Sequence, residues 1–157
     1  MKPELDALDH RILSRYQHDT RLAAEAIGAE VGLSAAAVQR RLKRMREAGV
    51  IVGEVAVLDR RALDLQVTVV VTVDLIDEGQ AAVDRFRHSM CARPEVQQCY
   101  ATAGSVDYVL VLVLPDLPAY ERFAREWLQG DPNVRSFTTH VVLDVAKAEM
   151  ALPLPPR

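Results

Sequence analysis

The sequence has little cysteine, no long apolar run and little net charge. Its two cysteines, Cys91 and Cys99, are too few and too irregularly spaced for a disulfide framework or a zinc site, so we interpret both as packing residues. The longest wholly apolar run, Tyr108 to Leu114, is far shorter than the roughly 20 residues that a membrane-spanning helix needs. The first residues are acidic, unlike those of an export signal, and free thiols suit a reducing compartment. We therefore expect a globular cytoplasmic protein.

The net charge of −3 conceals an uneven distribution. Residues 1–60 carry ten basic and nine acidic side chains, whereas residues 61–157 carry nine basic and thirteen acidic ones. A protein that binds nucleic acid need not be basic overall if its cations are gathered on one element, so the overall charge argues neither way. Half of the residues are hydrophobic, which is enough for one packed domain or two small ones.

One short stretch, residues 33–49, has the features of a complete amphipathic helix. Its apolar residues recur at spacings of three to five, close to the helical period, which predicts one buried face. That face consists of Leu33, Val38, Leu42 and Met45. Ser34 can cap the first turn, and Gly49 can adopt the left-handed conformation that ends a helix.

Five cations fall within seven residues of this helix. They are Arg40, Arg41, Lys43, Arg44 and Arg46. Like charges four residues apart repel one another and weaken a helix in water, whereas a phosphate backbone attracts all of them. A basic face that is merely solvated is the alternative. The two helical patterns that come before this helix in the chain favour a DNA-reading helix instead.

Two shorter amphipathic patterns precede the basic helix. Residues 5–18 carry apolar side chains at helical spacing and acidic ones in the first turn, and residues 22–31 form a second helical pattern. Gly32 then supplies a turn. Three helices with a tight glycine-containing turn before the third predict a helix-turn-helix domain in residues 1–49.

The rest of the chain predicts a linker and an α+β domain. Residues 50–65 begin with a β-branched, nearly alternating run, which predicts a linker strand. From residue 66 onward the order of elements is β-α-β-β-α-β, which predicts a ferredoxin-like domain over residues 66–157, with an open four-stranded sheet and both helices on one side. The expected strands are residues 66–75, 95–102, 105–114 and 134–145, and the expected helices are residues 78–91 and a stretch that begins after Asp116.

The third expected strand is apolar on both faces. Val109, Val111 and Val113 alternate with large apolar side chains at the positions between them. Antiparallel sheets usually show one polar face to water, so a second apolar face indicates an interface. A two-fold dimer is the economical cover, and it also presents two reading helices to DNA.

With these features the chain resembles the Lrp/AsnC, or feast/famine, family of bacterial and archaeal transcription regulators over nearly its whole length. The motifs that match in order and spacing are LDALDHRIL, GLS, RRLKRMREAGVI, PEVQQCYATAG, PDLPAYERF and Lys147 before LPL. The resemblance implies a winged or plain helix-turn-helix joined to a ferredoxin-like effector domain, homodimers through the sheet, and octamers or hexadecamers. It also implies amino-acid effectors that bind between dimers near Gly104.

The resemblance assigns DNA contacts to the basic helix. Family members often carry a capping Ser or Thr at the position of Ala23, and losing such a cap costs about 1 kcal/mol. Many also carry Pro or Thr where this chain has Ala35 to Ala37, and alanine can touch a thymine methyl group but cannot hydrogen-bond a base edge. For Arg41, a phosphate contact and a brace through an acidic residue remain open. The candidate DNA-binding residues are Ser34, Ala36, Gln39, Arg40, Arg41, Lys43 and Arg44.

The second candidate site is the hairpin around Gly104. This residue alone would be most simply a turn glycine, but with Asp107 at the family spacing we favour a ligand-facing hairpin. Backbone amides can receive a carboxylate, and an acidic side chain can receive an ammonium group. Residues 138–140 are weaker candidates, since the sheet's own surroundings can satisfy their side chains. The candidate effector-binding residues are Tyr100, Thr102, Gly104, Asp107 and Thr138.

An enzyme is the alternative class of function. Some relatives of this family act as haem-pathway decarboxylases on a similar scaffold, so the fold alone does not settle the function. Such an enzyme has no use for five clustered cations on a capped helix, and the hairpin lacks a cluster of His and Arg. We therefore expect a regulator. His10, His18 and His88 have no metal-ligand spacing, and we predict neither a metal site nor a cofactor.

Overall fold

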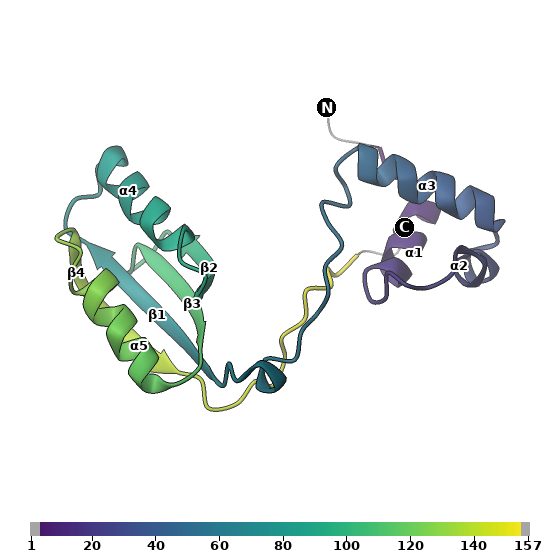
Figure 1. Cartoon of the computed structure of the whole chain (residues 1–157). Coiled ribbons are helices and arrows are strands. Elements are labelled where there is room, and N and C mark those ends of the chain that lie inside the picture. The colour runs from purple at the N-terminus through teal and green to yellow at the C-terminus, as the bar shows by residue number, and fades with distance from the viewer. Residues whose placement is uncertain (1–3, 155–157) are drawn as a thin grey trace. The chain divides into compact units, whose positions relative to one another are not determined.

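The structure is a computed structural model that describes residues 4–154 (Figure 1). Contacts within the chain divide it into two compact units. The first holds the N-terminal residues up to Val57 together with the C-terminal segment from Lys147, and the second is Leu58–Ala146. The sequence predicts one domain over residues 66–157, whereas the contacts place its last segment in the N-terminal unit. None of the described helices is long and apolar enough to cross a membrane.

The N-terminal unit is built from three helices. They are α1 (Ala7–Tyr16), α2 (Ala24–Val31) and α3 (Ala35–Glu47) (Figure 1). Each lies within a predicted helical stretch and is shorter by two residues at one or both ends. Their apolar sides close one core, which confirms the predicted burial of Val38, Leu42 and Met45. The core residues are Ile12, Tyr16, Ile27, Val31, Val38, Leu42 and Met45.

The turn between α2 and α3 is tight and depends on glycine. Gly32 ends α2 with a φ of 77°, in the left-handed region. A Cβ on Gly28 would lie 2.4 Å from the carbonyl oxygen of Leu33, so only glycine lets the turn pack this closely on α2. Ser34 caps α3 as predicted, because its Oγ accepts a hydrogen bond of 3.3 Å from an amide of the first turn. Ala23 gives α2 no side-chain cap.

A buried ion cluster joins α1 to α3. Asp9 is fully buried and forms a capping box with Asp6, in which each carboxylate accepts a hydrogen bond from the other residue's amide. Arg41 Nη1 donates to Asp6 Oδ2 at 2.7 Å and to Asp9 Oδ1 at 2.8 Å. Arg44 Nη2 donates to Asp9 Oδ2. Because a buried carboxylate without such partners would be strongly destabilising, this cluster fixes α3 against α1.

The predicted linker strand is absent from the structure. Residues 50–65 contain an extended segment and a short 3₁₀ helix, η1 (Arg61–Leu63). Val52, Val55 and Val57 are exposed. Their β-branched side chains favour extended backbone, but a strand also needs a neighbouring strand for its hydrogen bonds, and within the described chain this segment has none.

The C-terminal segment contacts α1 through a side-chain amide. Gln17 Nε2 donates to the carbonyl oxygen of Leu152 at 3.1 Å, and the amide of Leu152 donates to Gln17 Oε1 at 2.9 Å. Ala151 and Leu154 beside it are partly buried. The N-terminal unit is therefore connected to the rest of the chain at two places.

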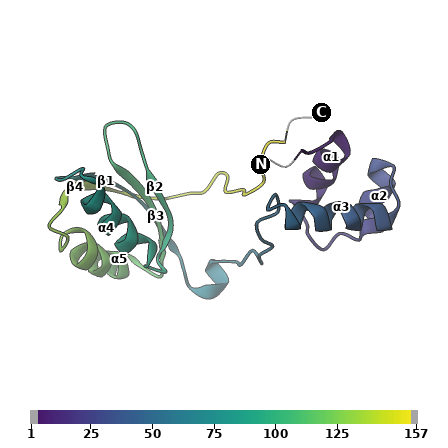
Figure 2. The same cartoon turned by 90° about the horizontal axis from the view of Figure 1, so that it is seen from above.

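The second unit is a four-stranded antiparallel sheet with its helices on one face (Figure 2). The strand order is β2-β3-β1-β4. The strands are β1 (Val67–Leu75), β2 (Val96–Ala101), β3 (Tyr108–Leu114) and β4 (Val134–Val141). The helices are α4 (Gln80–Cys91) and α5 (Leu117–Phe123), the latter continued by a π-helical turn, η2 (Ala124–Leu128). The predicted ferredoxin-like order is confirmed, although β4 ends four residues before the predicted boundary.

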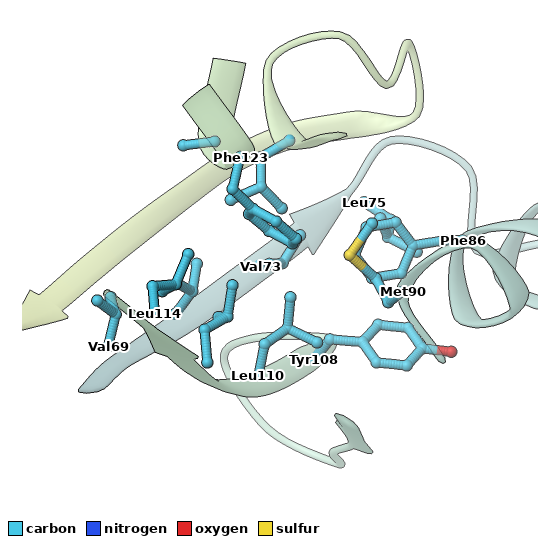
Figure 3. Packing of buried hydrophobic residues seen from close by; sticks show 13 residues of the cluster. Val69, Val73, Leu75, Phe86, Met90, Tyr108, Leu110, Leu114 and Phe123 are labelled. Atoms are coloured by element: carbon cyan, nitrogen blue, oxygen red, sulfur yellow. The ribbon is translucent and has the colours of Figure 1, made fainter. Parts of the chain in front are cut away.

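The core of this unit lies between the helices and one face of the sheet (Figure 3). Alternate residues of β1 and β3 are buried there, under Phe86 and Met90 of α4 and Phe123 of α5. Val70 and Val111 pair on the opposite face and are only partly buried. The second apolar face is therefore present. One end of it is covered, because Arg60 Nη1 donates to the Thr68 hydroxyl at 2.7 Å and Val113 opposite Thr68 is buried, whereas Val70, Val109 and Val111 stay only partly buried.

Replacing Ala23 by Ser should raise the free energy of unfolding by about 1 kcal/mol, because the new hydroxyl would accept a hydrogen bond from a free amide at the start of α2. Chemical denaturation of the full-length protein measures this change. The control is Ala26→Ser, which places the same hydroxyl at an exposed position inside α2 and should give no gain. Equal stabilisation by both variants would contradict the capping explanation.

Replacing Arg41 by Ala should lower the free energy of unfolding by about 3 kcal/mol. This is the low end of the range for breaking a buried ion pair, because Arg44 still reaches Asp9. Lys43→Ala, on the exposed side of the same helix, should change it by less than about 0.5 kcal/mol. Urea denaturation at neutral pH compares the two variants. A loss no greater for Arg41→Ala than for Lys43→Ala would show that the ion cluster does not brace α3.

Candidate DNA-binding helix and effector hairpin

The exposed side of α3 carries most of the candidate DNA contacts. The exposed candidates on this side are Ser34, Ala36, Gln39, Arg40 and Lys43. Within residues 4–154, no hydrogen bond or ion pair holds the side chains of Gln39 and Arg40. Lys43 makes a 3.8 Å contact with Glu47, and both side chains are largely exposed, so the pair contributes at most about 0.5 kcal/mol. These side chains are therefore available to bases and phosphates.

Arg41 lies on the inner side of α3. Of the two roles that the sequence leaves open, the structure shows the brace, because its guanidinium is bonded to Asp6 and Asp9. The hydrogen bonds to Asp6 and then to Asp9 raise the pKa of Arg41. The backbone amide of Asp9, followed by Arg41, lowers the pKa of Asp6. Arg41 and Asp6 therefore both stay charged at neutral pH.

Two more cations of the run have partners within the N-terminal unit. Arg44 bonds buried Asp9, although about half of its side chain is exposed. Arg46 Nε donates to Glu54 Oε1 at 2.8 Å and Arg46 Nη2 to the Tyr16 hydroxyl at 2.7 Å, with the guanidinium 5.5 Å from the Tyr16 ring centroid. Three of the five cations thus help to attach α3, which the count of positive charges alone does not reveal.

The hairpin between β2 and β3 is exposed at Gly104. The φ of Gly104 is not positive, and a Cβ added there would meet no atom within 4 Å. Neither backbone conformation nor packing within the described chain therefore requires glycine at this position. The hairpin is closed by Thr102, whose hydroxyl donates to the carbonyl of Val106 and whose amide donates to the carbonyl of Asp107 at 2.9 Å.

Asp107 has a structural role that the sequence does not reveal. Its Oδ2 accepts a hydrogen bond of 2.6 Å from the amide of Leu75, and its own amide donates to the carbonyl of Val73 at 2.9 Å. The register of β1 with β4 shifts between Asp74 and Leu75, so the carboxylate satisfies an amide beside this irregularity. Within the described residues, Asp107 Oδ1 accepts no hydrogen bond and is available to a ligand.

Tyr100 and Thr138 lie on the open face of the sheet, on opposite edge strands. The register places them in one row, because Tyr100 is opposite Val109, Val109 is opposite Thr72, and Thr72 is opposite Thr138. Neighbouring strands are about 4.8 Å apart, so three steps separate the two residues by roughly 14 Å. One chain therefore gathers every candidate effector residue near the hairpin except Thr138.

An acidic residue that the sequence did not single out lies on the same open face. Asp74 Oδ2 accepts a hydrogen bond of 2.8 Å from the Ser136 hydroxyl, at the end of β1 beside the hairpin. The sequence signal that could have found Asp74 is that it is the only acidic residue in β1, whose other residues are apolar or carry a hydroxyl. Thr139, a weaker candidate, has its hydroxyl bonded to the hydroxyl of Tyr120, in agreement with the expectation that its own surroundings satisfy it.

Two protein-family models match the chain. The AsnC-type helix-turn-helix domain matches residues 5–46, and the Lrp/AsnC ligand binding domain matches residues 68–152. The first match contains the three helices of the N-terminal unit except Glu47, the last residue of α3, and the second contains the sheet with its helices except Val67, the first residue of β1.

Similar proteins match the chain over nearly its whole length. An HTH-type transcriptional regulator of Sinorhizobium fredii is 38% identical over 151 residues, which cover 96% of this chain and 89% of that protein. The leucine-responsive regulatory protein of Escherichia coli is 31% identical, covering 92% of this chain and 88% of that one. The crystal structure of an AsnC family regulator from Agrobacterium tumefaciens is 33% identical with a TM-score of 0.90, covering 96% and 97% of the two chains. A complex of a Neisseria meningitidis transcriptional regulator with L-Met has the same TM-score and coverage at 29% identity.

The relatives named above are transcriptional regulators, and none supports the decarboxylase alternative. The three-helix unit and the ferredoxin-like sheet agree with both family models. The chain is a transcriptional regulator and not an enzyme, and it belongs to the Lrp/AsnC family.

Proposed function

We propose that this regulator binds duplex DNA through the exposed side of α3 as a two-fold dimer, and that a small effector bound at the Gly104 hairpin controls it. DNA binding is assigned to residues 1–49, and effector binding and assembly to residues 66–157. The observation that carries the proposal is the division of α3 into a braced inner side and an exposed outer side. A regulator must reach the genome, so we also propose that it acts in the cytoplasm.

The outer side of α3 has the chemistry that duplex DNA requires. An α-helix fits the major groove, where Arg pairs with guanine and Gln with adenine through two hydrogen bonds each. Gln39 and Arg40 are the side chains assigned to bases. Lys43 and the exposed part of Arg44 lie one turn further along and are assigned to phosphates, whose neutralisation releases counterions.

A second copy of the chain is the proposed cover for the open face of the sheet. Val70, Val109 and Val111 form its partly buried apolar centre, and the hydroxyls of Thr72 and Thr138 lie in the same row as Val109. A self-complementary apolar patch closes a two-fold dimer. Such a dimer would offer two α3 helices to successive major grooves about 34 Å apart. Octamers belong to the same proposal, because an effector held between dimers requires more than one dimer.

The proposed effector is an amino acid or a related small metabolite. One similar structure, the Neisseria meningitidis regulator, is a complex with L-Met. In this chain, amides near Gly104 would receive the carboxylate and Asp107 Oδ1 the ammonium group, since Asp107 Oδ2 is bonded to the Leu75 amide. Tyr100 and Thr102 would contact the ligand's side chain. Thr138 would enter the site from another copy, because it stands on the far edge strand.

Control by the effector requires different affinities for different assemblies. A ligand with equal affinity for two assemblies does not shift the equilibrium between them, however tightly it binds. A site that is shared between copies meets this condition, because it is complete in only one of the assemblies.

Substitutions on α3 should separate phosphate contacts from base contacts. Lys43→Ala should weaken binding to a selected site and to a random duplex alike, and it should reduce the salt slope by about one unit. Gln39→Ala and Arg40→Ala should instead each reduce discrimination between the two duplexes by about 1 to 3 kcal/mol, because each removes the hydrogen bonds to one base. Genomic selection with footprinting identifies the site, and fluorescence anisotropy at several salt concentrations measures the affinities.

The control for this series is Arg125→Ala in η2, which removes a cation that is paired with Glu121 at 2.9 Å. It should leave both the affinity and the salt slope unchanged. If all three α3 variants lower both affinities equally, the assigned reading roles are wrong. If the folded protein enriches no duplex at moderate salt, α3 does not have the proposed role.

Asp107→Asn should abolish the response to the effector without unfolding the hairpin. Asparagine keeps an acceptor oxygen for the Leu75 amide but removes the charge that pairs with an ammonium group. At one hundred times its Kd, a ligand stabilises the wild-type protein by about 2.7 kcal/mol, and a thermal-shift series with the twenty amino acids detects this gain. The variant should lose the shift while keeping its melting temperature without ligand.

Asp116→Asn is the matched control, because this residue caps α5 by accepting the Ala119 amide at 2.6 Å. It should keep the full ligand response. Unchanged ligand affinity in Asp107→Asn, measured by calorimetry, would remove Asp107 from the site. An assembly state that a bound ligand leaves unaltered in analytical ultracentrifugation would contradict the proposed control by assembly.

A further inference from the structure

The thiol of Cys91, at the end of α4, is close enough to the thiol of Cys99, in the edge strand β2, to act on its ionisation. Cys91 is the last residue of α4 and is exposed, whereas Cys99 lies in β2 and is partly buried. Cys99 is opposite Leu110 of β3, whose side chain is buried under the helices, so Cys99 faces α4. Burial, followed by the neighbouring thiol of Cys91, raises the pKa of Cys99 to about 11.

A cation of α4 stands beside the thiol pair. Asp84, Arg87 and Cys91 follow one another at spacings of three and four, so they lie along one stripe of the helix. Arg87 Nη2 is 2.7 Å from Asp84 Oδ1, and its charge acts to lower the pKa of Cys99, against the effect of burial. Burial, followed by the thiol of Cys99, raises the pKa of Tyr108, whose ring is seen beside Phe86 and Met90 in Figure 3. The thiolate is the reactive form of a cysteine, and Cys91 is the more exposed of the two side chains.

We propose that Cys91 and Cys99 are an oxidation site, at which a hydroperoxide converts the two thiols into an intrachain disulfide. The thiolate of Cys91 attacks one oxygen of the hydroperoxide, the O–O bond breaks, and the leaving alkoxide or hydroxide takes up the proton that the thiol had released, which gives an alcohol or water. Cys91 is thereby oxidised to a sulfenic acid. The sulfur of Cys99 then attacks the Cys91 sulfur, an S–S bond forms, the S–O bond breaks, and water leaves with the Cys99 proton. One hydroperoxide accepts the two electrons that the thiols lose.

The two cysteines have different roles because their surroundings differ. Cys91 is exposed at the end of a helix and meets the oxidant first. Cys99 is partly buried and keeps its proton until the sulfenic acid forms beside it. The new bond would tie the end of α4 to β2, and β2 continues through Tyr100 and Thr102 into the hairpin. The sequence-based interpretation of both cysteines as packing residues is thus extended by a chemical role.

The test uses the reduced full-length protein with hydrogen peroxide as the oxidant. Peptide mapping without reductant should find one Cys91–Cys99 disulfide in monomeric chains, with both thiols lost together and recovered with dithiothreitol. The melting temperature should rise by several degrees on oxidation, because the cross-link restricts the unfolded chain. In Cys99→Ala, Cys91 should stop at a sulfenic acid that dimedone traps. In Cys91→Ala, Cys99 should stay reduced at the same dose.

Two results would overturn the proposal. One is a wild-type protein that keeps both thiols at a peroxide concentration that oxidises free N-acetylcysteine. The other is disulfide formation only between chains. Cys91→Ala changes an exposed side chain, so the variant should keep the wild-type melting temperature in the reduced state, and this measurement checks that it is folded. Neither DNA nor effector enters the assay, so its outcome is independent of the proposed DNA and effector sites.

Discussion

The exposed side of α3 is defined by the burial of one carboxylate. Asp9 has no exposed surface, and moving a charge out of water costs several kcal/mol unless partners replace the lost hydration. Arg41 and Arg44 are those partners, and they reach Asp9 only when α3 lies against α1 in one orientation. Gln39, Arg40 and Lys43 face solvent as a result. The surface that we assign to DNA is thus set by how a negative charge is neutralised inside the unit.

Local signals in the sequence predicted the helices well, but they did not predict the partners of the cations. The apolar stripe, the Ser34 cap and the Gly32 turn depend on neighbours along the chain, and each is found as predicted. The partners of Arg41 and Arg46 come from α1 and from residue 54, which no helical period reveals. Counting positive charges therefore located the helix but overstated the number of cations that are free to bind phosphate.

In the sheet, too, features that depend on neighbours along the chain were predicted, and contacts between distant residues were not. Alternation of valines predicted β1 and β3, and the order of elements predicted the fold. The same alternation in residues 50–59 wrongly predicted a strand, because extended backbone becomes a strand only beside a partner. The family spacing from Gly104 made Asp107 a candidate effector residue, but its bond to the Leu75 amide depends on a register that only the folded sheet sets. Thr138 fell on the far edge for the same reason.

The bonds between Gln17 and Leu152 give the N-terminal unit a second tether. A cut in the exposed segment at residues 52–57 would break one connection and leave the other, so the two fragments would stay joined by two hydrogen bonds and the packing around them. The side-chain amide of Gln17 thus joins the end of α1 to a segment 135 residues later in the chain, so the compact N-terminal unit is assembled from the two ends of the sequence.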